Sequence, residues 1–468
     1  MKEVAPENRS DPRVAIASLP ERRYAEGPAC HAQMVKALTR AAASLDWAEE
    51  ARGPFAHVIP AGARVLIKPN FVTHENHGPG GIEPLVTHPA LVRATAEAAL
   101  RAGASQVLVG DAPVQGCDFD SLLSATGLDT WSADLMKADA RFKGIQDFRR
   151  TTCVFEGGVR IASENLQDEG RFVLFDLGAD SLLEPITDRR ASFRVTCYDP
   201  RLMARTHAPG RHQYLIARDA LDADVIINLP KLKTHKKAGI TCALKNLIGI
   251  NGNKEYLPHH RAGGSRSGGD CYPGSSVVKR AIEYALDRQN QAASFAAGTL
   301  WHQLAVNLTS VSLRAGDELG VEGSWSGNDT IWRTALDLNR ILLYGRADAT
   351  MADAPERRVL HVADAVIAGQ GDGPLRPDPL PMGLIFMGGN ACAMDWVGAH
   401  LLGYDPARIA IVRESFGNFR WPITLFASSD VSVVGDMGRG IADELFGSRE
   451  IPDVKYPAGW RDAARASN

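Results

Sequence analysis

The sequence lacks the cysteine motifs that hold zinc ribbons or iron–sulfur clusters. Its seven cysteines are scattered over 468 residues, and none forms a Cys-x-x-Cys pair. This pattern excludes a recognisable zinc-ribbon or ferredoxin-type module, so we expect no iron–sulfur cluster. Scattered cysteines in odd number also suit a reducing compartment, which favours a cytoplasmic location.

Long apolar runs and a strong charge bias are missing as well. The first residues, MKEVAPENRSDPR, have no apolar core of a signal peptide, and no stretch is long enough to span a bilayer. We therefore expect no membrane partner. The formal net charge is -3, without the basic excess of a general nucleic-acid binder. Any anion site must therefore be local.

Neither common nucleotide-binding fingerprint is present. The chain contains no G-x-G-x-x-G and no G-x-x-x-x-G-K-[ST] segment, so the sequence does not identify a particular nucleotide. A strand, a glycine-rich turn and a helix start do occur at 384–402, which is a general anion-binding arrangement.

The chain does have short apolar runs that alternate with helical patterns. Residues 65–68, 106–110 and 225–229 are typical of strands buried in a parallel sheet. Pro89 begins and Gly103 ends a helix between the first two, which predicts a βαβ unit. We predict the α/β class, with two Rossmann-like parallel-sheet lobes and a cleft between them.

The predicted organisation follows these patterns. A length of 468 residues suits two or three domains, and the oligomeric state is not predicted. We expect a disordered tail at 1–12, an N-terminal α/β lobe at 13–222 with an insertion at about 115–210, a C-terminal α/β lobe at 223–440 with a mobile glycine-rich loop at about 252–274, and a C-terminal tail at 441–468.

The stretch 223–250, ADVIINLPKLKTHKKAGITCALKNLIGI, carries the strongest functional signal. Its strand stops at Pro230, and ligands of open α/β sheets bind beyond the carboxyl ends of strands. Lys231, Lys233, His235, Lys236 and Lys237 follow within seven residues. Because apolar residues are interleaved, we predict that some of these side chains point into a cleft and bind a phosphate or carboxylate. Pairing with acidic residues elsewhere in the fold remains the alternative.

Polar residues at neighbouring strand ends extend this candidate site. Lys68 and Asn70 follow one strand and Asp111 follows the next, although each could instead be a turn residue. Asn339, beside Arg340, lies on a largely apolar helix face and needs a polar partner. The predicted substrate-binding residues are Lys68, Asn70, Lys231, Lys233, Asn246, Asn339, Arg340 and Asp372.

The predicted catalytic residues are His235, Lys245 and Asp111. Burial of Lys245 beside other cations would lower its pKa and leave it partly neutral, hence nucleophilic or basic. His235 could transfer protons near neutral pH, or Asp111 or Asp372 could take the proton instead. We predict no metal site, because the histidines at 74–77 lack zinc-protease spacing.

The chain resembles the bacterial and archaeal family known as domain of unknown function 362. The resemblance rests on VLIKPNFV at 65–72, THPALVRATAEAALRAGASQVLVGDAP at 87–113, INLPKLKTHKKAGITCALKNLIG at 227–249, ADAVIAGQGDGP at 363–374 and AMDWVGAHLLGYDP at 393–406. Many members carry an added ferredoxin-like cysteine module. This chain has none, so electron transfer through such a cluster is not implied.

The central stretch also resembles, more distantly, the lactate racemase superfamily, which uses a nickel-pincer nucleotide. His235 precedes Ala238-Gly239, and Lys245 follows ten residues after the histidine. In that superfamily the lysine is attached to the cofactor and a histidine binds nickel or acts as an acid or base. The resemblance implies these roles for Lys245 and His235, with His259 or His260 as a later histidine. The segment 240–244 and the surroundings of Asp111 depart from the superfamily pattern.

These features together predict an enzyme that acts on a small carboxylated or phosphorylated molecule in a cleft lined by lysine and histidine. Isomerase, epimerase or lyase chemistry fits a partly neutral lysine beside a histidine. Two other classes stay open: a redox enzyme with a nickel-pincer or nucleotide cofactor, and a non-catalytic protein that binds an anionic ligand.

Overall fold

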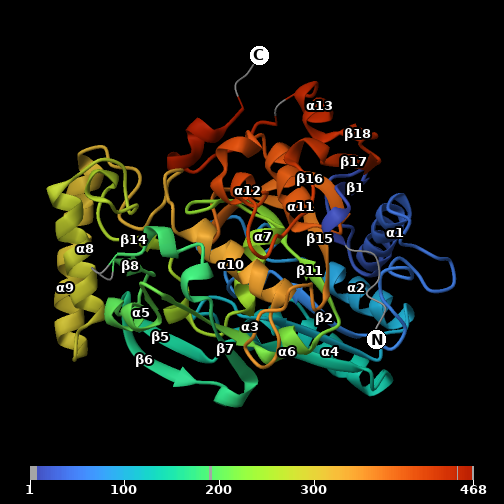
Figure 1. Cartoon of the computed structure of the whole chain (residues 1–468), viewed down its shortest axis with the longest axis horizontal. Helices are drawn as coiled ribbons and strands as arrows, with labels where there is room; N and C mark the ends of the chain where they lie inside the picture. The colour runs from blue at the N-terminus through green and yellow to red at the C-terminus, as the bar shows by residue number, and fades with distance from the viewer. Residues whose placement is uncertain (1–7, 189–191, 451, 466–468) are drawn as a thin grey trace.

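The computed structural model describes residues 8–188, 192–450 and 452–465. One 11-stranded sheet, mostly parallel, runs through the molecule in the order β18-β17-β1-β16-β15-β11-β2-β3-β4, with β12 and β13 attached beside β15 (Figure 1). The predicted α/β class is confirmed. The strands are β1 Arg13–Ser18, β2 Arg64–Pro69, β3 Gln106–Asp111, β4 Phe142–Asp147, β11 Val225–Leu229, β12 Lys231–His235, β13 Gly239–Thr241, β15 Arg358–Asp372, β16 Arg376–Gly388, β17 Ser432–Gly435 and β18 Gly440–Ile441.

The strands predicted for two separate lobes lie in this one sheet. Strand β11 pairs in parallel with β2 on one side and with β15 on the other. All five residues of β11 are buried, so the strand needs a covering layer on both faces and a neighbour at both edges. The two halves of the chain join at β11, which gives this strand both neighbours. One continuous sheet therefore takes the place of the predicted cleft between two lobes.

Helices cover both faces of the sheet, as the continuous burial of its central strands requires. In β2, Val65 and Ile67 face the core that contains α1 (Pro28–Ser44) and α2 (Pro89–Arg101), whereas Leu66 faces the opposite core. That second core contains α7 (Ala243–Asn246), α10 (Ile331–Tyr344) and α11 (Ala391–Leu401). The arrangement leaves the strand ends as the place where polar groups of several strands meet.

The predicted βαβ unit is present. Helix α2 begins with Pro89 at its first position, and the His88 side chain accepts a hydrogen bond from the backbone N–H of Ala90. Gly103 follows the helix with a φ of 103°, a conformation that glycine adopts without strain. Strands β2 and β3 then pair in parallel, which brings their carboxyl ends together.

The segment between β4 and β11 forms a second layer at one side of the molecule, where the sequence predicts an insertion (Figure 1). Together with the later helical hairpin α8–α9, it lies at the edge of the main sheet. These elements are β5 Thr151–Glu156, β6 Val159–Asn165, β7 Phe172–Asp176, β8 Phe193–Arg194, α5 Pro200–Thr206, β9 His207–Ala208, β10 Arg211–Ala217, α6 Arg218–Asp222, α8 Val277–Asn290 and α9 Phe295–Arg314. Helices α3 (Phe119–Ala125) and α4 (Leu128–Ala138) precede β4, and α4 packs against that strand.

The segments predicted as tails and as a mobile loop contain short structured elements. Asn8–Ser10 is a 3-10 helix, while residues 1–7 of the predicted tail lie outside the described residues. The 252–274 segment contains the 3-10 turn η6 (Lys254–Tyr256) and β14 (His260–Arg261), which pairs with β8; its mobility stays a prediction. Near the C-terminus, α12 (Ala410–Glu414) and α13 (Ala442–Gly447) precede the buried Trp460, whose Nε1 donates to the carbonyl of Lys236 at 2.6 Å. Across the described residues, no helix is both long and apolar enough to cross a membrane.

Candidate functional site

The carboxyl ends of β2 and β3 hold a buried ion pair. Lys68 Nζ lies 2.6 Å from Asp111 Oδ1. The same ammonium donates to the carbonyl of Pro69 at 2.8 Å and to Asn246 Oδ1 at 3.3 Å. Burial lowers the pKa of Lys68, and the charge of Asp111 opposes that shift. All three donors of this lysine therefore have partners within the protein.

Side-chain amides continue this network across α7. Asn246 accepts a hydrogen bond from Asn70 Nδ2 at 2.9 Å and donates to Asn228 Oδ1 at 2.7 Å. Asn228 in turn donates to the carbonyl of Ala243 at 2.9 Å. The predicted residues Lys68, Asn70, Asp111 and Asn246 thus do meet at one sheet edge. Because their polar groups are largely used on one another, we assign them to the rigid floor of the site.

Gly249 completes that floor because no larger residue fits there. A β-carbon at this position would lie 2.0 Å from Asp111 Oδ1 and 2.6 Å from Lys68 Nζ. The Gly249 carbonyl accepts a hydrogen bond from the N–H of Ala112 at 2.9 Å, which fixes the close approach of the two segments.

The lysines of β12 have different surroundings. Lys231 Nζ forms a buried ion pair with Asp364 Oδ2 at 2.8 Å and also donates to Tyr24 Oη at 2.7 Å. Lys233 is equally buried, but among the described residues its ammonium donates only to the carbonyl of Leu85. Burial, followed by the charge of Lys231, holds the pKa of Lys233 well below its usual value. Lys231 is therefore paired, as the alternative interpretation of the basic run expects, whereas Lys233 is not.

Two further lysines have no hydrogen-bond or ion-pair partner among the described residues. The side chains of Lys245 and Lys254 are partly buried, and neither ammonium hydrogen-bonds or ion-pairs with any residue of the described ranges. Burial lowers the pKa of Lys245 to about 7, and the nearby charge of Lys254 adds to the shift. Burial likewise lowers the pKa of Lys254 to about 8, although the Asp111 carboxylate opposes the change. An amine with a pKa near neutrality is suited to accept protons or attack a carbonyl carbon.

Two histidines beside these lysines carry their protons on opposite nitrogens. His235 Nδ1 accepts from the backbone N–H groups of Lys237 at 3.0 Å and Ala238 at 3.2 Å, so its ring proton is on Nε2. His259 Nδ1 lies 2.6 Å from the carbonyl of Leu257 and donates to it, which leaves Nε2 as an acceptor. Burial and then the charge of a neighbouring lysine hold the pKa of both histidines well below the usual value. Both rings are therefore neutral, one able to donate and the other able to accept.

We call Lys233, His235, Lys245, Lys254 and His259 the lysine–histidine cluster. Its members are close enough for the charge of Lys245 to lower the pKa of Lys233, His235 and His259. Within the described part of the chain, no carboxylate lies within ion-pair distance of any cluster lysine. The cluster is thus a group of basic side chains, buried or partly buried, that has no carboxylate counter-ion among the described residues, which favours an anionic ligand.

Three of the predicted substrate-binding residues do not belong to the lysine–histidine cluster. Asn339 Nδ2 donates to the carbonyl of Leu244 at 3.0 Å, and Arg340 forms a buried ion pair with Asp337 at 2.7 Å. Asp372 is exposed at the end of β15. Asn339 therefore supports the segment before Lys245, whereas Arg340 already has its counter-ion. In the ranges that the structure describes, no group of three or more His, Cys, Asp or Glu side chains could hold a metal ion.

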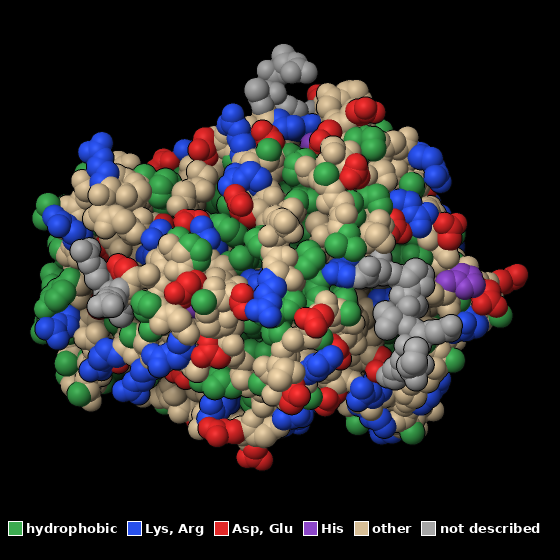
Figure 2. Space-filling view, viewed as in Figure 1, with side chains coloured by type: hydrophobic (Ala, Val, Ile, Leu, Met, Phe, Trp, Pro, Cys, Tyr) green, Lys and Arg blue, Asp and Glu red, His purple; other side chains and the backbone are tan. Residues whose placement is uncertain are grey.

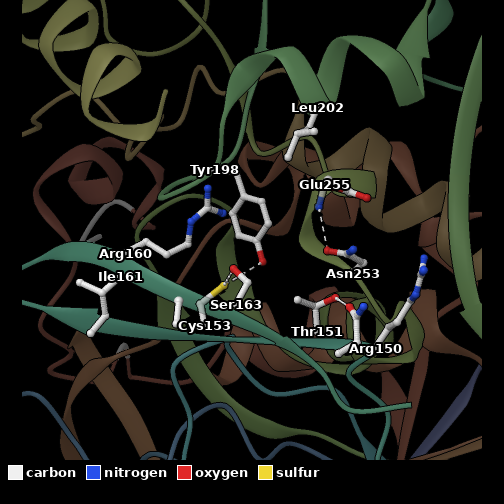
Figure 3. Close-up of a pocket in the computed structure, with 12 residues that line it drawn as sticks. Arg150, Thr151, Cys153, Arg160, Ile161, Ser163, Tyr198, Leu202, Asn253 and Glu255 are labelled. Atoms are coloured by element: carbon white, nitrogen blue, oxygen red, sulfur yellow. Dashed lines mark hydrogen bonds between the residues drawn. The ribbon is translucent and has the colours of Figure 1, made fainter. Parts of the chain in front are cut away.

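Sequence reasoning missed Lys254 as a member of the site. It lies in the polar segment Asn251-Gly252-Asn253-Lys254-Glu255, which resembles an ordinary loop. The residues on either side of Lys254 line a pocket of about 450 Å³, shown in Figure 3, between the β5–β6 hairpin and α5. A basic residue soon after the central stretch was the available signal, but only the fold brings the η6 turn back to Lys245.

Comparisons with known proteins match one family model, and the similar proteins include one sequence and one solved structure. The family described as "Domain of unknown function (DUF362)" matches residues 65–164 and 184–400. The chain is 23% identical over 367 residues to the thylakoid-associated protein sll1697 of Synechocystis sp., covering 78% of this chain and 71% of that protein. A crystal structure of a Thermotoga maritima protein has a TM-score of 0.32 and 11% identity over 76% of this chain, which spans only 55% of that protein. None of these matches bears on the likeness to the lactate racemase superfamily, which stays a prediction.

Proposed function

The chain belongs to the family described as "Domain of unknown function (DUF362)", and we propose that it is an enzyme acting on a small carboxylated or phosphorylated molecule at the lysine–histidine cluster. One observation carries the proposal: Lys245 and Lys254 are partly buried without an internal partner among the described residues. Unpaired charges away from water are unfavourable. An anionic ligand would provide the missing counter-charge.

The cluster supports chemistry that begins with removal of a proton next to a carbonyl or carboxylate. With a pKa of about 7, about half of the Lys245 side chains are neutral at pH 7 and can take that proton. The electron pair of the broken C–H bond moves to the substrate oxygen, where the Nε2–H of His235 can donate a hydrogen bond. Lys254, whose pKa is about 8, balances the negative charge that develops.

The fate of the resulting enolate distinguishes the reaction types. Return of the proton to the same carbon from the other side gives epimerisation, and its return to another carbon gives isomerisation. Departure of a group from the neighbouring carbon, together with its electron pair, gives a lyase reaction. His259, whose Nε2 is an acceptor, could move the second proton. We propose this class of chemistry without assigning one substrate.

A hydrogen-exchange assay tests the proposal before the substrate is known. The purified chain is incubated in D₂O at pH 7.5 with pools of small carboxylates and sugar phosphates, and proton NMR follows the loss of C–H signals. We expect exchange in at least one pool and its abolition by Lys245→Met. Lys36→Met, which removes an exposed lysine on α1, is the matched control. Exchange that persists in Lys245→Met would remove the basis of the proposal.

A trapping experiment tests the neutral amine independently of turnover. Glyoxylate, a small anionic aldehyde, forms an imine with a neutral lysine and releases water, and cyanoborohydride then reduces the imine by hydride transfer. Peptide mass mapping at pH 7 should find the product at Lys245 first, with protection by inorganic phosphate. Labelling spread evenly over exposed lysines, without protection by phosphate, would contradict the proposed site.

The same measurements separate the two remaining classes. A non-catalytic anion-binding protein would show phosphate protection of Lys245 but no exchange in any pool. A redox enzyme with a nickel-pincer nucleotide would contain nickel by elemental analysis and a covalent mass addition at Lys245. We also propose a cytoplasmic location in a bacterium. Because one relative is named for association with thylakoids, cell fractionation with a chain-specific antibody is the appropriate measurement.

A further inference from the structure

A polar pocket of about 450 Å³ lies beside the lysine–histidine cluster. The β5–β6 hairpin forms one wall, the segment around Tyr198 and Leu202 forms the second, and the η6 turn forms the third (Figure 3). Its volume falls within the range of small-molecule sites. Nothing in the chemistry proposed above uses this pocket.

Arg160 is the most informative residue of its lining. Its guanidinium lies 5.6 Å from the ring centre of Tyr198, and Figure 3 shows the two groups next to each other. The Tyr198 hydroxyl is in turn 3.8 Å from Cys153 Sγ. No residue of the described ranges hydrogen-bonds to the Arg160 guanidinium or pairs with it. The Tyr198 ring attracts the guanidinium through a cation–π contact, and the five N–H donors of Arg160 remain available.

Other groups of the lining make the pocket suitable for an oxyanion. Arg150 also contributes a guanidinium, which pairs with the exposed Glu169, and its Nε is buried without a hydrogen-bond partner in the structure. Ser163 and Asn253 contribute neutral polar groups. Glu255 is the one acidic residue of the lining, and burial raises the pKa of its carboxyl group. The lining thus contains two guanidinium groups and a single carboxyl group, whose charged form is disfavoured by burial.

We propose that this pocket is a second anion-binding site, which takes a carboxylate or phosphate group through the guanidinium of Arg160. A planar guanidinium binds either group through two parallel N–H···O bonds. The bound group is either the far end of the substrate or a separate small anion. The first source rests on the proposed function, whereas the second does not.

The η6 turn connects the pocket to the cluster. Asn253 and Glu255 line the pocket, while the Lys254 between them lies close enough to Lys245 and Lys68 to interact electrostatically with both. Asn253 Oδ1 accepts from the N–H of Glu255 at 3.5 Å, which helps to shape the turn. A group bound in the pocket would therefore contact the same short turn that supplies a lysine to the cluster.

Equilibrium dialysis with radiolabelled inorganic phosphate at pH 7 tests the proposal. We expect two phosphates per wild-type chain and one per chain in Arg160→Met, with affinity at the pocket reduced at least about tenfold, as for loss of a charge-assisted hydrogen bond. Arg160→Lys should restore part of that affinity because it keeps the charge. Arg211→Met, which removes an exposed arginine on β10, should still bind two. Thermal unfolding of each variant checks that it is folded.

The outcomes separate this proposal from the proposed function. If Arg160→Met binds phosphate with unchanged stoichiometry and affinity, the pocket is not an anion site. If only the Arg160-dependent phosphate binds, and Lys245→Met changes nothing, the pocket stands and the cluster proposal fails. Binding measurements with dicarboxylates of increasing length, from succinate to suberate, identify the source of the bound anion. One bound molecule whose affinity falls in both variants indicates a two-headed substrate, and two independent molecules indicate a separate anion.

Discussion

Replacing Lys245 by methionine should stabilise the fold while it removes activity. Methionine matches the lysine stem in length but carries no charge, so the variant removes the unfavourable transfer of an ammonium group away from water. The pKa of Lys245 is about 7 in the folded chain against 10.5 in its reference state. A lowered lysine pKa means that the native state binds protons less tightly than the unfolded state does.

The magnitude and its pH dependence follow from that difference. Below pH 7 the charged form is disfavoured in full, and above pH 10.5 the effect disappears, so the contribution of Lys245 to stability improves as pH rises between these values. Removing the group should raise the free energy of unfolding by at most about 4 kcal/mol at pH 7 and about 1 kcal/mol at pH 10. Partial solvent access to the side chain reduces both figures.

Urea denaturation followed by circular dichroism at pH 7, 8.5 and 10 measures the effect. The informative quantity is the difference between variant and wild type at each pH, because groups remote from Lys245 titrate equally in both chains and cancel. Lys36→Met, at an exposed helix position, should change stability by less than about 0.5 kcal/mol at every pH. A Lys245→Met variant that is less stable than wild type, or whose advantage does not shrink with pH, would refute the assignment of Lys245 as an unpaired, partly buried amine.

Three further outcomes are expected. Gly249→Ala should lower the free energy of unfolding by more than about 2 kcal/mol, because its β-carbon would lie 2.0 Å from Asp111 Oδ1. Gly440→Ala is the control, since nothing lies within 4 Å of the added atom there. Equal unfolding midpoints of the two variants in urea would contradict the packing argument. Lys231→Met should cost about 3–5 kcal/mol, because it leaves Asp364 buried without its cation; a loss below about 1 kcal/mol would show that the pair is hydrated. Phosphate binding at pH 8 should take up protons, since an anion raises the lowered pKa values of Lys245 and Lys254; calorimetry in buffers of different ionisation enthalpy measures the uptake, and affinity that does not fall from pH 7 to 9 would contradict it.

The sequence predicts the local elements of the site well. The apolar run 225–229 is β11, and Pro89 and Gly103 mark the start and the end region of α2. These signals are local because a few adjacent residues determine them. A short apolar run indicates a strand buried on both faces, and proline and glycine have special backbone preferences. The meeting of Lys68, Asn70, Asp111 and Asn246 at one edge then follows from parallel strand order.

The long-range pairing could not be predicted in the same way. Two lobes and one continuous sheet need the same individual strands, and they differ only in whether β11 pairs with both β2 and β15. Whether a lysine has a buried counter-ion depends on such pairing too. Lys231 and Lys233 lie in similar sequence surroundings, yet Lys231 pairs with Asp364 from β15, whereas Lys233 donates to the backbone carbonyl of Leu85 and has no carboxylate partner among the described residues. A counter-ion that lies about 130 residues away in the sequence cannot be recognised from the residues next to the lysine.

The geometry of β12 explains why positive charge remains unneutralised at this place in the fold. Side chains of a strand point to the same side at every second residue, so Lys231, Lys233 and His235 form a row. The register with β15 shifts between Lys231, opposite Asp364, and Lys233, opposite Gly369. A β-carbon at Gly369 would lie 2.6 Å from the β-carbon of Lys233, so no acidic side chain can stand there. The first lysine of the row is neutralised by Asp364 of the neighbouring strand, and we propose that a bound anion balances charge beyond it.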